Sequence, residues 1–282
     1  MSAKQLEGKP LADARRDDLA GRASALAART GTPPCLAVVI GTSDGAALAY
    51  FRAKQRLGGK LGVRVLDARV AEATTKSLVD AVRALSADPS VDAIMVETPV
   101  AAGVDLRAVQ DAIPAEKDVD GASTLSLGRL FSGQPGFVPA TAAAVMALLD
   151  GHGIELRGAH AVVVGRSLVV GRPLGQLLLA RGATVTACHS KTRELEEHVR
   201  FADVVCVAVG KPRFLKADWV RPGAVVVDVG TNVVGDALVG DVDFAAVSDV
   251  AGWISPVPGG VGPLTTVLLL ENVVRAAETS RP

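Results

Sequence analysis

Tyr50 and Lys54 are residues whose types and spacing could support chemistry. They lie four positions apart in a segment predicted to be helical, so both side chains project from one face. A tyrosine and a lysine on one face can stack on a substrate and activate it. The same spacing occurs in short-chain dehydrogenases, but there it follows the glycine loop of the nucleotide domain, whereas here it precedes such a loop by more than one hundred residues. The alternative is a half-buried tyrosine beside a solvated lysine.

Three loops also have sequences that suit ligand binding. Glu97 follows a predicted strand, and ligands of open α/β sheets bind beyond the carboxyl ends of the strands. Asp118 and Asp120 lie in Lys117-Asp-Val-Asp-Gly121, where turn formation is the alternative to a functional role. The segment 256–263 reads Pro-Val-Pro-Gly-Gly-Val-Gly-Pro, and its glycines would let the backbone approach a flat ligand closely.

A glycine loop begins the second half of the chain. Val164-Gly165-Arg166-Ser167 ends a predicted strand, and Val170-Gly171-Arg172-Pro173 opens a predicted helix. Backbone N–H groups and the helix dipole converge in such a loop, which predicts phosphate binding. Gly165 and Gly171 are six apart, so the pattern is not GxGxxG, and a tight turn is the alternative.

The next strand indicates which nicotinamide dinucleotide binds. In NAD-binding domains an acidic residue about twenty positions further on bonds the ribose 2′-hydroxyl. Here Cys188-His-Ser-Lys-Thr192 follows the strand, with Arg166 nearby and no carboxylate at the strand end. A 2′-phosphate is therefore favoured, and the predicted cofactor is NADP. For His189 and Lys191 a solvated loop is the alternative.

These residues require a scaffold of alternating strands and helices. A βαβ rhythm in the first half predicts a small parallel α/β domain, and a second rhythm from about residue 159 predicts a doubly wound sheet. A Gly/Pro-rich segment at 131–136 predicts a hinge, so we expect domains at 1–138, completed by a helical segment 264–282, and at 139–263. The expected strands are 35–40, 63–66, 91–96, 161–165, 183–187, 204–208 and 224–228. The expected helices span about 10–28, 74–85, 106–113, 173–181 and 264–277, with others starting near 44 and ending near 150.

Composition limits the classes of function. The chain has 282 residues, 49% of them hydrophobic and 3% aromatic, which suits two α/β domains with cores of Val, Leu and Ala. Thirty basic and thirty acidic residues cancel, which argues against a nucleic-acid partner. Three separated cysteines and four histidines argue against disulfides and metal sites, and they favour a cytosolic protein. We expect no membrane span, because no apolar run approaches the required length, and no signal peptide, because the N-terminal residues contain no apolar region after a basic one.

Several blocks of the chain, taken in order, resemble one family. The blocks are Tyr50-x-x-x-Lys54, Lys117-Asp-Val-Asp-Gly121, Val164-Gly-Arg-Ser167 with Val170-Gly-Arg-Pro173, Cys188-His-Ser-Lys-Thr192, Asp228-Val-Gly230, Val239-Gly-Asp-Val-Asp243 and Pro256-Val-Pro-Gly-Gly-Val-Gly-Pro263. The family that they resemble is the bifunctional methylenetetrahydrofolate dehydrogenase/methenyltetrahydrofolate cyclohydrolase family, and the resemblance covers nearly the whole chain. It implies an N-terminal folate-side domain and an inserted Rossmann-like NADP-binding domain that face each other across a cleft, in a cytosolic homodimer.

The resemblance also implies roles for individual residues. Lys54 would be the catalytic lysine, Tyr50 would stack on the folate rings, and Asp120 would hydrogen-bond the pterin. The residues implied to hold NADP are Gly165, Arg166, Ser167 and Ser190, with Thr231 near the nicotinamide. Those implied to lie against folate are Pro258, Gly259 and Gly260.

The implied reactions belong to one-carbon metabolism and purine biosynthesis. They are the oxidation of 5,10-methylenetetrahydrofolate to 5,10-methenyltetrahydrofolate with NADP, and hydrolysis of that product to 10-formyltetrahydrofolate. Hydride transfer requires mainly orientation from the protein. Hydrolysis requires proton transfer, for which Lys54 would be the group.

Glu97 departs from the family pattern, because members usually carry glutamine where this chain has Val96-Glu97-Thr98-Pro99. A carboxylate near Lys54 would stabilise the ammonium form of the lysine. Ala47, Ser126 and Pro139-Ala-Thr-Ala142 also depart from the usual residues, and we expect them in loops that line the cleft. The sequence therefore predicts a divergent member in which oxidation is retained and hydrolysis is weakened.

Three alternatives stay open. The first is a dehydrogenase that acts on a modified folate or pterin in a specialised pathway. The second is a non-catalytic NADP- or folate-binding paralogue, although the presence of both Tyr50 and Lys54 argues against it. The third is a two-domain oxidoreductase similar to shikimate dehydrogenase, which offers no match to the segment 256–263.

Overall fold

The computed structural model describes residues 2–281, and the chain divides into two compact units. Unit 1 contains the residues up to Asp13 together with Pro139–Thr265. Unit 2 contains Ala14–Val138 together with the residues from Thr266 onward. Helices α1 (Lys9–Thr30) and α10 (Val261–Ser280) each begin in unit 1 and continue in unit 2.

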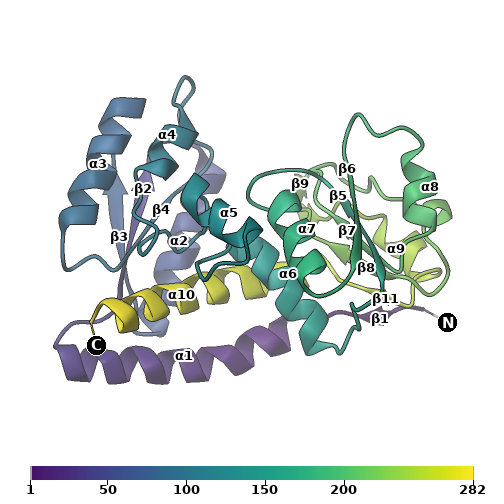
Figure 1. Cartoon of the computed structure of the whole chain (residues 1–282), viewed down its shortest axis with the longest axis horizontal. Coiled ribbons are helices and arrows are strands. Elements are labelled where there is room, and N and C mark those ends of the chain that lie inside the picture. Colours follow the sequence, from purple (N-terminus) through teal and green to yellow (C-terminus); the bar gives the residue numbers. More distant parts are fainter. Residues whose placement is uncertain (1, 282) are drawn as a thin grey trace. The chain divides into compact units, whose positions relative to one another are not determined.

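Unit 2 is built on a parallel three-stranded sheet in the order β3-β2-β4 (Figure 1). All six residues of the central strand β2 (Cys35–Ile40) are buried, as expected for a parallel strand that is covered on both faces. Its alternate residues Cys35, Ala37 and Val39 pack in one core with residues of α3 (Thr75–Ala87) and α4 (Leu106–Asp111). The other elements of this unit are β3 (Arg64–Arg69), β4 (Ala93–Val96), α2 (Gly45–Lys60) and α5 (Thr124–Phe131).

Within unit 2, α1 and α10 lie side by side (Figure 1). Arg22 donates two hydrogen bonds to the carboxylate of Glu278, at 3.1 and 2.8 Å. Asn272 Nδ2 donates to the carbonyl of Val119 at 2.9 Å, which connects α10 to the loop beyond β4. The C-terminal helix is therefore part of the scaffold of this unit.

Unit 1 contains a parallel six-stranded sheet in the Rossmann-like order β1-β11-β8-β7-β5-β6 (Figure 1). Helix α7 packs against α6 and against β5 and β6, whereas α8 and α9 contribute to the core cluster with β7 and β8. The strands are β1 (Lys4–Gln5), β5 (His160–Val164), β6 (Thr184–Cys188), β7 (Val204–Val207), β8 (Val225–Asp228) and β11 (Trp253–Ile254), with the separate antiparallel hairpin β9 (Asn232–Val234) and β10 (Ala237–Val239). The helices are α6 (Ala140–Gly151), α7 (Gly171–Ala180), α8 (Leu195–Arg200) and α9 (Phe244–Ser248), with a 3-10 turn at Ala217–Trp219.

The α/β class expected from the sequence is confirmed, and every expected strand is present within a few residues of its predicted bounds. We expected the residues that depart from the family pattern to lie in loops, and this expectation is wrong. Ala47, Ser126 and residues 140–142 lie in α2, α5 and α6. The reason is local capping: the Asp44 carboxylate accepts the N–H of Ala47 at 2.8 Å, and Ser123 Oγ accepts the N–H of Ser126 at 3.2 Å. Helices therefore begin just before these positions.

Across residues 2–281, we find no helix with the length and apolar character that a bilayer crossing requires.

Candidate functional site

Helix α2 and the end of β4 bring Lys54 and Glu97 together. The N–H of Glu97 donates to the carbonyl of Val39 at 2.9 Å, which fixes its backbone to the sheet. The Lys54 ammonium donates to both carboxylate oxygens of Glu97, at 2.9 Å to Oε2 and 3.1 Å to Oε1. The side chains are only 13% and 6% exposed, so water screens this ion pair weakly.

Tyr50 lies one turn before Lys54 on the same face of α2. Its side chain is half exposed, at 54%, and it is the single tyrosine of the chain. A flat aromatic surface, an ammonium group and a carboxylate are therefore provided by one helix and one neighbouring strand end. This set suits a flat ring system that must exchange a proton.

The Asp118 carboxylate forms the turn that precedes α5. It is fully buried and accepts the N–H groups of Ala122 at 3.1 Å and Ser123 at 2.9 Å, so turn formation is confirmed for this residue. Asp120 lies within the same turn and is half-buried. Gly121 follows at φ +59°, where a Cβ would lie 2.7 Å from the carbonyl carbon of Val138. The turn fixes the backbone at Asp120, and its role toward a substrate stays a prediction.

The glycine loop of unit 1 has no room for side chains at its two glycines. Gly165 has φ +133°, and a Cβ there would lie 2.3 Å from the carbonyl oxygen of Ala208. A Cβ on Gly171 would lie 2.1 Å from the carbonyl oxygen of Gly165, so these residues meet although they are six apart in sequence. Ser167 Oγ accepts the N–H of Val170 at 3.1 Å, at the start of α7. The spacing differs from GxGxxG, but the close backbone approach is the same.

A pocket of about 230 Å³ lies beyond the carboxyl ends of β5, β6 and β7. Three of the residues predicted to bind the cofactor line this pocket: Gly165, Arg166 and Ser190. Ser167 is engaged at the start of α7, and Thr231 is exposed beyond β8. The lining residues are Val164, Gly165, Arg166, His189, Ser190, Leu195, Ala208, Val209, Lys211 and Phe214.

The chemistry of this lining fits the phosphate and ribose of a dinucleotide. Arg166 and Lys211 provide cations, and among the described residues no carboxylate lines the pocket. The N–H of Lys191 donates to Nδ1 of His189 at 3.1 Å, which places the proton of a neutral imidazole on Nε2. Cations and N–H donors without a carboxylate favour a 2′-phosphate over a ribose hydroxyl.

Val209, Lys211 and Phe214 were missed from the sequence. Val209 and Lys211 follow β7 directly, so the rule that ligands bind beyond strand carboxyl ends was a sufficient signal for them. The sequence held no local signal for Phe214, whose ring lies 5.9 Å from the Lys211 ammonium.

The segment 256–263 is packed against the N-terminal segment of unit 1. The N–H of Gly8 donates to the carbonyl of Gly259 at 2.8 Å, and a Cβ on Gly8 would lie 1.9 Å from the carbonyl oxygen of Gly260. Gly260 is buried, whereas Pro258 is exposed. Close packing of backbone on backbone thus explains Gly8 and Gly260 in this structure, and contact of this segment with folate stays a prediction.

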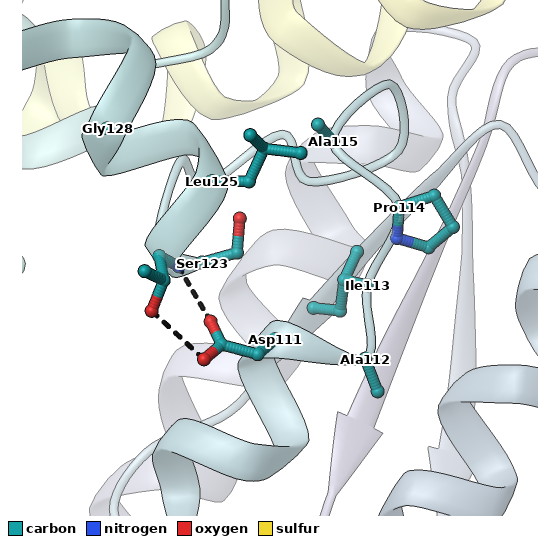
Figure 2. A pocket seen from close by; sticks show the side chains of 9 residues that line it. Asp111, Ala112, Ile113, Pro114, Ala115, Ser123, Leu125 and Gly128 are labelled. Carbon is teal, nitrogen blue, oxygen red and sulfur yellow. Dashed lines mark hydrogen bonds between the residues drawn. The ribbon is translucent and has the colours of Figure 1, made fainter.

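A further pocket, of about 590 Å³, lies between α4 and α5 and contains none of the predicted site residues (Figure 2). Its single charged side chain, Asp111, accepts the N–H of Thr124 at 2.6 Å and its hydroxyl at 2.9 Å. Both carboxylate oxygens are therefore engaged by the first residue of α5. Among the described residues, no group of three or more His, Cys, Asp or Glu side chains is arranged to hold a metal ion.

The Rossmann-like sheet, the glycine loop and the cationic pocket define a nucleotide-binding α/β protein, and the second unit adds a buried Lys-Glu pair beside an exposed tyrosine. Comparison with protein families narrows this class. The catalytic domain of tetrahydrofolate dehydrogenase/cyclohydrolase matches residues 6–120, and its NAD(P)-binding domain matches residues 139–281. The chain belongs to the tetrahydrofolate dehydrogenase/cyclohydrolase family.

Individual relatives match along the full chain. A protein of Nocardia farcinica named bifunctional protein FolD is 50% identical over 283 residues, which span all of both chains. The structure of the bifunctional enzyme FolD from Campylobacter jejuni is 37% identical, with a TM-score of 0.95 over 99% of each chain. A FolD structure from Trypanosoma brucei, complexed with NADP and an inhibitor, is 33% identical, with a TM-score of 0.95 over all of both chains.

A shikimate dehydrogenase from Aquifex aeolicus is 14% identical with a TM-score of 0.55, covering 90% of this chain and 99% of that one. This likeness concerns the fold alone, so the shikimate-dehydrogenase-like alternative gains no support for its activity.

Proposed function

We propose that this protein oxidises 5,10-methylenetetrahydrofolate with NADP and hydrolyses the methenyl product to 10-formyltetrahydrofolate, the second reaction being weakened. Family membership supports the reaction pair, and the Trypanosoma brucei relative is described with NADP. The observation that carries the weakened hydrolysis is the buried ion pair between Lys54 and Glu97.

For the oxidation, the protein mainly has to orient its ligands. When bound, NADP supplies the hydride acceptor. Arg166, Ser190 and the glycine loop are the proposed holders of its phosphate and ribose, because they line one pocket. Tyr50 is the proposed stacking surface for the folate rings, since its ring is exposed on α2. Neither role requires a strong acid or base.

For the hydrolysis, a proton must move as water adds and the ring opens. Lys54 Nζ is the proposed atom at which that proton is held. Both carboxylate oxygens of Glu97 accept hydrogen bonds from Nζ, so Nζ must leave a buried ion pair before it can exchange a proton with the substrate. A neutral glutamine at position 97 would form no ion pair with Lys54. We therefore expect this chain to hydrolyse the methenyl intermediate more slowly than it forms that intermediate.

Two assays on one preparation test the proposal: NADP-dependent oxidation of methylenetetrahydrofolate, and hydrolysis of methenyltetrahydrofolate. We expect oxidation to be readily measured and hydrolysis to be slower. Comparable rates would overturn the weakening, and the absence of both reactions would favour a non-catalytic paralogue. Preference for another folate or pterin in the same assays would favour the modified-folate alternative.

We further propose that the protein is a cytosolic homodimer that supplies one-carbon units to reactions such as purine biosynthesis. Its three cysteines are buried free thiols, which agrees with a reducing compartment. The hairpin β9–β10 exposes Val233, Val234 and Leu238, apolar side chains that a second copy would cover. Light scattering at micromolar concentration should give twice the mass of one chain. The Val233→Asp substitution should lower the measured mass toward that of one chain. A monomeric wild-type protein would contradict this.

A further inference from the structure

The turn that follows β7 forms one wall of the pocket proposed for NADP. Val209 and Lys211 both line this pocket, and Gly210 between them has φ +64°. We name Val209–Lys211 the β7 turn. The Lys211 ammonium lies 5.9 Å from the centroid of the Phe214 ring, and both residues line the pocket together with Arg166.

Three consecutive backbone N–H groups of the β7 turn donate to one carboxylate, that of Asp241. The N–H groups of Val209 and Gly210 lie 2.6 and 2.8 Å from Oδ2, and that of Lys211 lies 2.8 Å from Oδ1. Successive N–H groups arranged in this way form a concave anion-binding site, of the kind that holds phosphate in other proteins. Here the anion is a side chain of the protein itself.

Asp241 is fully buried, so these bonds replace the hydrogen bonds that water would otherwise donate to its side chain. A fourth hydrogen bond comes from Asn232 Nδ2 at 2.9 Å, which uses the remaining acceptor capacity of the carboxylate. The backbone of Asp241 is itself fixed, because its N–H donates to Asp228 Oδ1 at 2.9 Å. The carboxylate is therefore held in place at the end of the sheet.

The same carboxylate also determines the path of the chain beyond β8. A Cβ on Gly230 would lie 2.1 Å from Cγ of Asp241, so the backbone passes directly over the carboxylate. Thr231, the residue expected near the nicotinamide, lies between Gly230 and the Asn232 that bonds Asp241. One buried side chain thus contacts both segments that follow β7 and β8.

We propose that Asp241 is a positioning residue for the cofactor site: it holds the β7 turn and the segment around Thr231 in the arrangement that NADP binds, and it occupies the anion site of the β7 turn. The phosphates of the cofactor are thereby left to the glycine loop at Gly165. This inference rests on the proposed function, because it names a determinant of NADP binding at the same pocket.

The test is direct titration of the purified protein with NADP, without substrate, for Asp241→Asn and for the matched control Asp243→Asn. Asp243 belongs to the same sequence block, but its carboxylate pairs with Lys216 at 3.3 Å, outside the cofactor pocket. We expect Asp241→Asn to raise the dissociation constant about tenfold or more, because an amide offers one acceptor oxygen where the carboxylate offers two. The KM for methylenetetrahydrofolate should stay within about twofold of the wild-type value. General destabilisation would not weaken NADP binding while it left this KM unchanged.

A second pair of variants decides the question if Asp241→Asn does not fold. Gly210→Ala leaves the carboxylate in place but disfavours the left-handed turn, and a Cβ there would meet nothing within 4 Å. Gly153→Ala is the control, since Gly153 has φ +67°, is equally open, and lies far along the chain, between α6 and β5. We expect Gly210→Ala to weaken NADP binding about fivefold and Gly153→Ala to leave it unchanged.

The outcomes separate the two claims. If wild-type protein does not bind NADP, the proposed function fails. If wild-type protein binds NADP and folded Asp241→Asn binds it as tightly as Asp243→Asn, the role of Asp241 is overturned. Equal binding by Gly210→Ala and Gly153→Ala overturns it as well.

Discussion

Lys54 and Glu97 determine the chemistry proposed for unit 2. Their side chains form a nearly dry ion pair at 2.9 Å. Removing one partner of such a pair leaves an uncompensated buried charge, with a penalty of about 3–5 kcal/mol. Substitution of the lysine therefore has both a catalytic and a structural consequence.

Lys54→Met should lower the rate of methenyltetrahydrofolate hydrolysis by about a hundredfold, because it removes the group that holds the proton. The unfolding temperature should fall too, since Glu97 then remains buried without its partner. Oxidation should be retained within about tenfold, because orientation does not depend on that proton. The rates of hydrolysis and oxidation and a thermal melt test these expectations. The control is Lys60→Met, because Lys60 is an exposed residue of the same helix. Undiminished hydrolysis by Lys54→Met would refute the role of the lysine.

At the scale of elements, the loop between β5 and α7 requires two glycines. Gly165→Ala should abolish measurable NADP binding, because its Cβ would lie 2.3 Å from a carbonyl oxygen of the neighbouring strand end. Gly175→Ala in α7 is the control, since its Cβ would make an ordinary contact at 3.6 Å with Val185. Cofactor titration of the two variants distinguishes them. Normal NADP binding by folded Gly165→Ala would show that the cofactor does not depend on this loop.

The longer elements could be predicted from sequence, because buried parallel strands are continuous apolar runs bounded by glycine or polar residues. The strands at Cys35–Ile40 and Val204–Val207 are examples. Two strands could not be predicted from sequence: Lys4–Gln5 and Trp253–Ile254. A strand of two residues forms only because it pairs with a strand that is distant in sequence. The hairpin around Gly235 was missed although Gly-Asp between short apolar runs is a recognised hairpin signal.

The candidate site was predictable to a similar extent. The proximity of Glu97 to Lys54 was anticipated from the family resemblance, in which Glu97 replaces a glutamine, and the structure brings the two side chains together. Asp241 was not singled out, because the three N–H groups that it accepts lie about thirty residues earlier and meet it only in the folded sheet. Contacts of this kind have no local sequence pattern.

For the molecule as a whole, stability should depend on the ionisation of Asp228. Burial raises the pKa of this carboxyl to about 6, in spite of three backbone N–H groups that donate to it, and the nearby Asp241 acts in the same direction as burial. The folded protein therefore takes up this proton near pH 6, whereas the unfolded chain does so near pH 4. Between these values the folded state holds more protons, so the contribution of Asp228 to the free energy of unfolding rises as pH falls.

Urea unfolding at several pH values from 7 to 5 measures this effect against Asp228→Asn, which lacks the titrating group. The wild-type protein should gain stability relative to the variant as pH falls, toward a limit of about 3 kcal/mol at still lower pH. Parallel pH profiles for the two proteins would show that Asp228 does not titrate in this range.

The most direct test of the account is the ratio of methenyltetrahydrofolate hydrolysis to methylenetetrahydrofolate oxidation in Glu97→Gln and in wild-type protein. Glu116→Gln, at an exposed site in the same unit, is the control. We predict that the ratio rises about tenfold in Glu97→Gln, with oxidation nearly unchanged, because the neutral amide forms no ion pair that Lys54 Nζ must leave before it exchanges a proton. An unchanged or lower ratio would contradict the claim that the carboxylate of Glu97 limits hydrolysis.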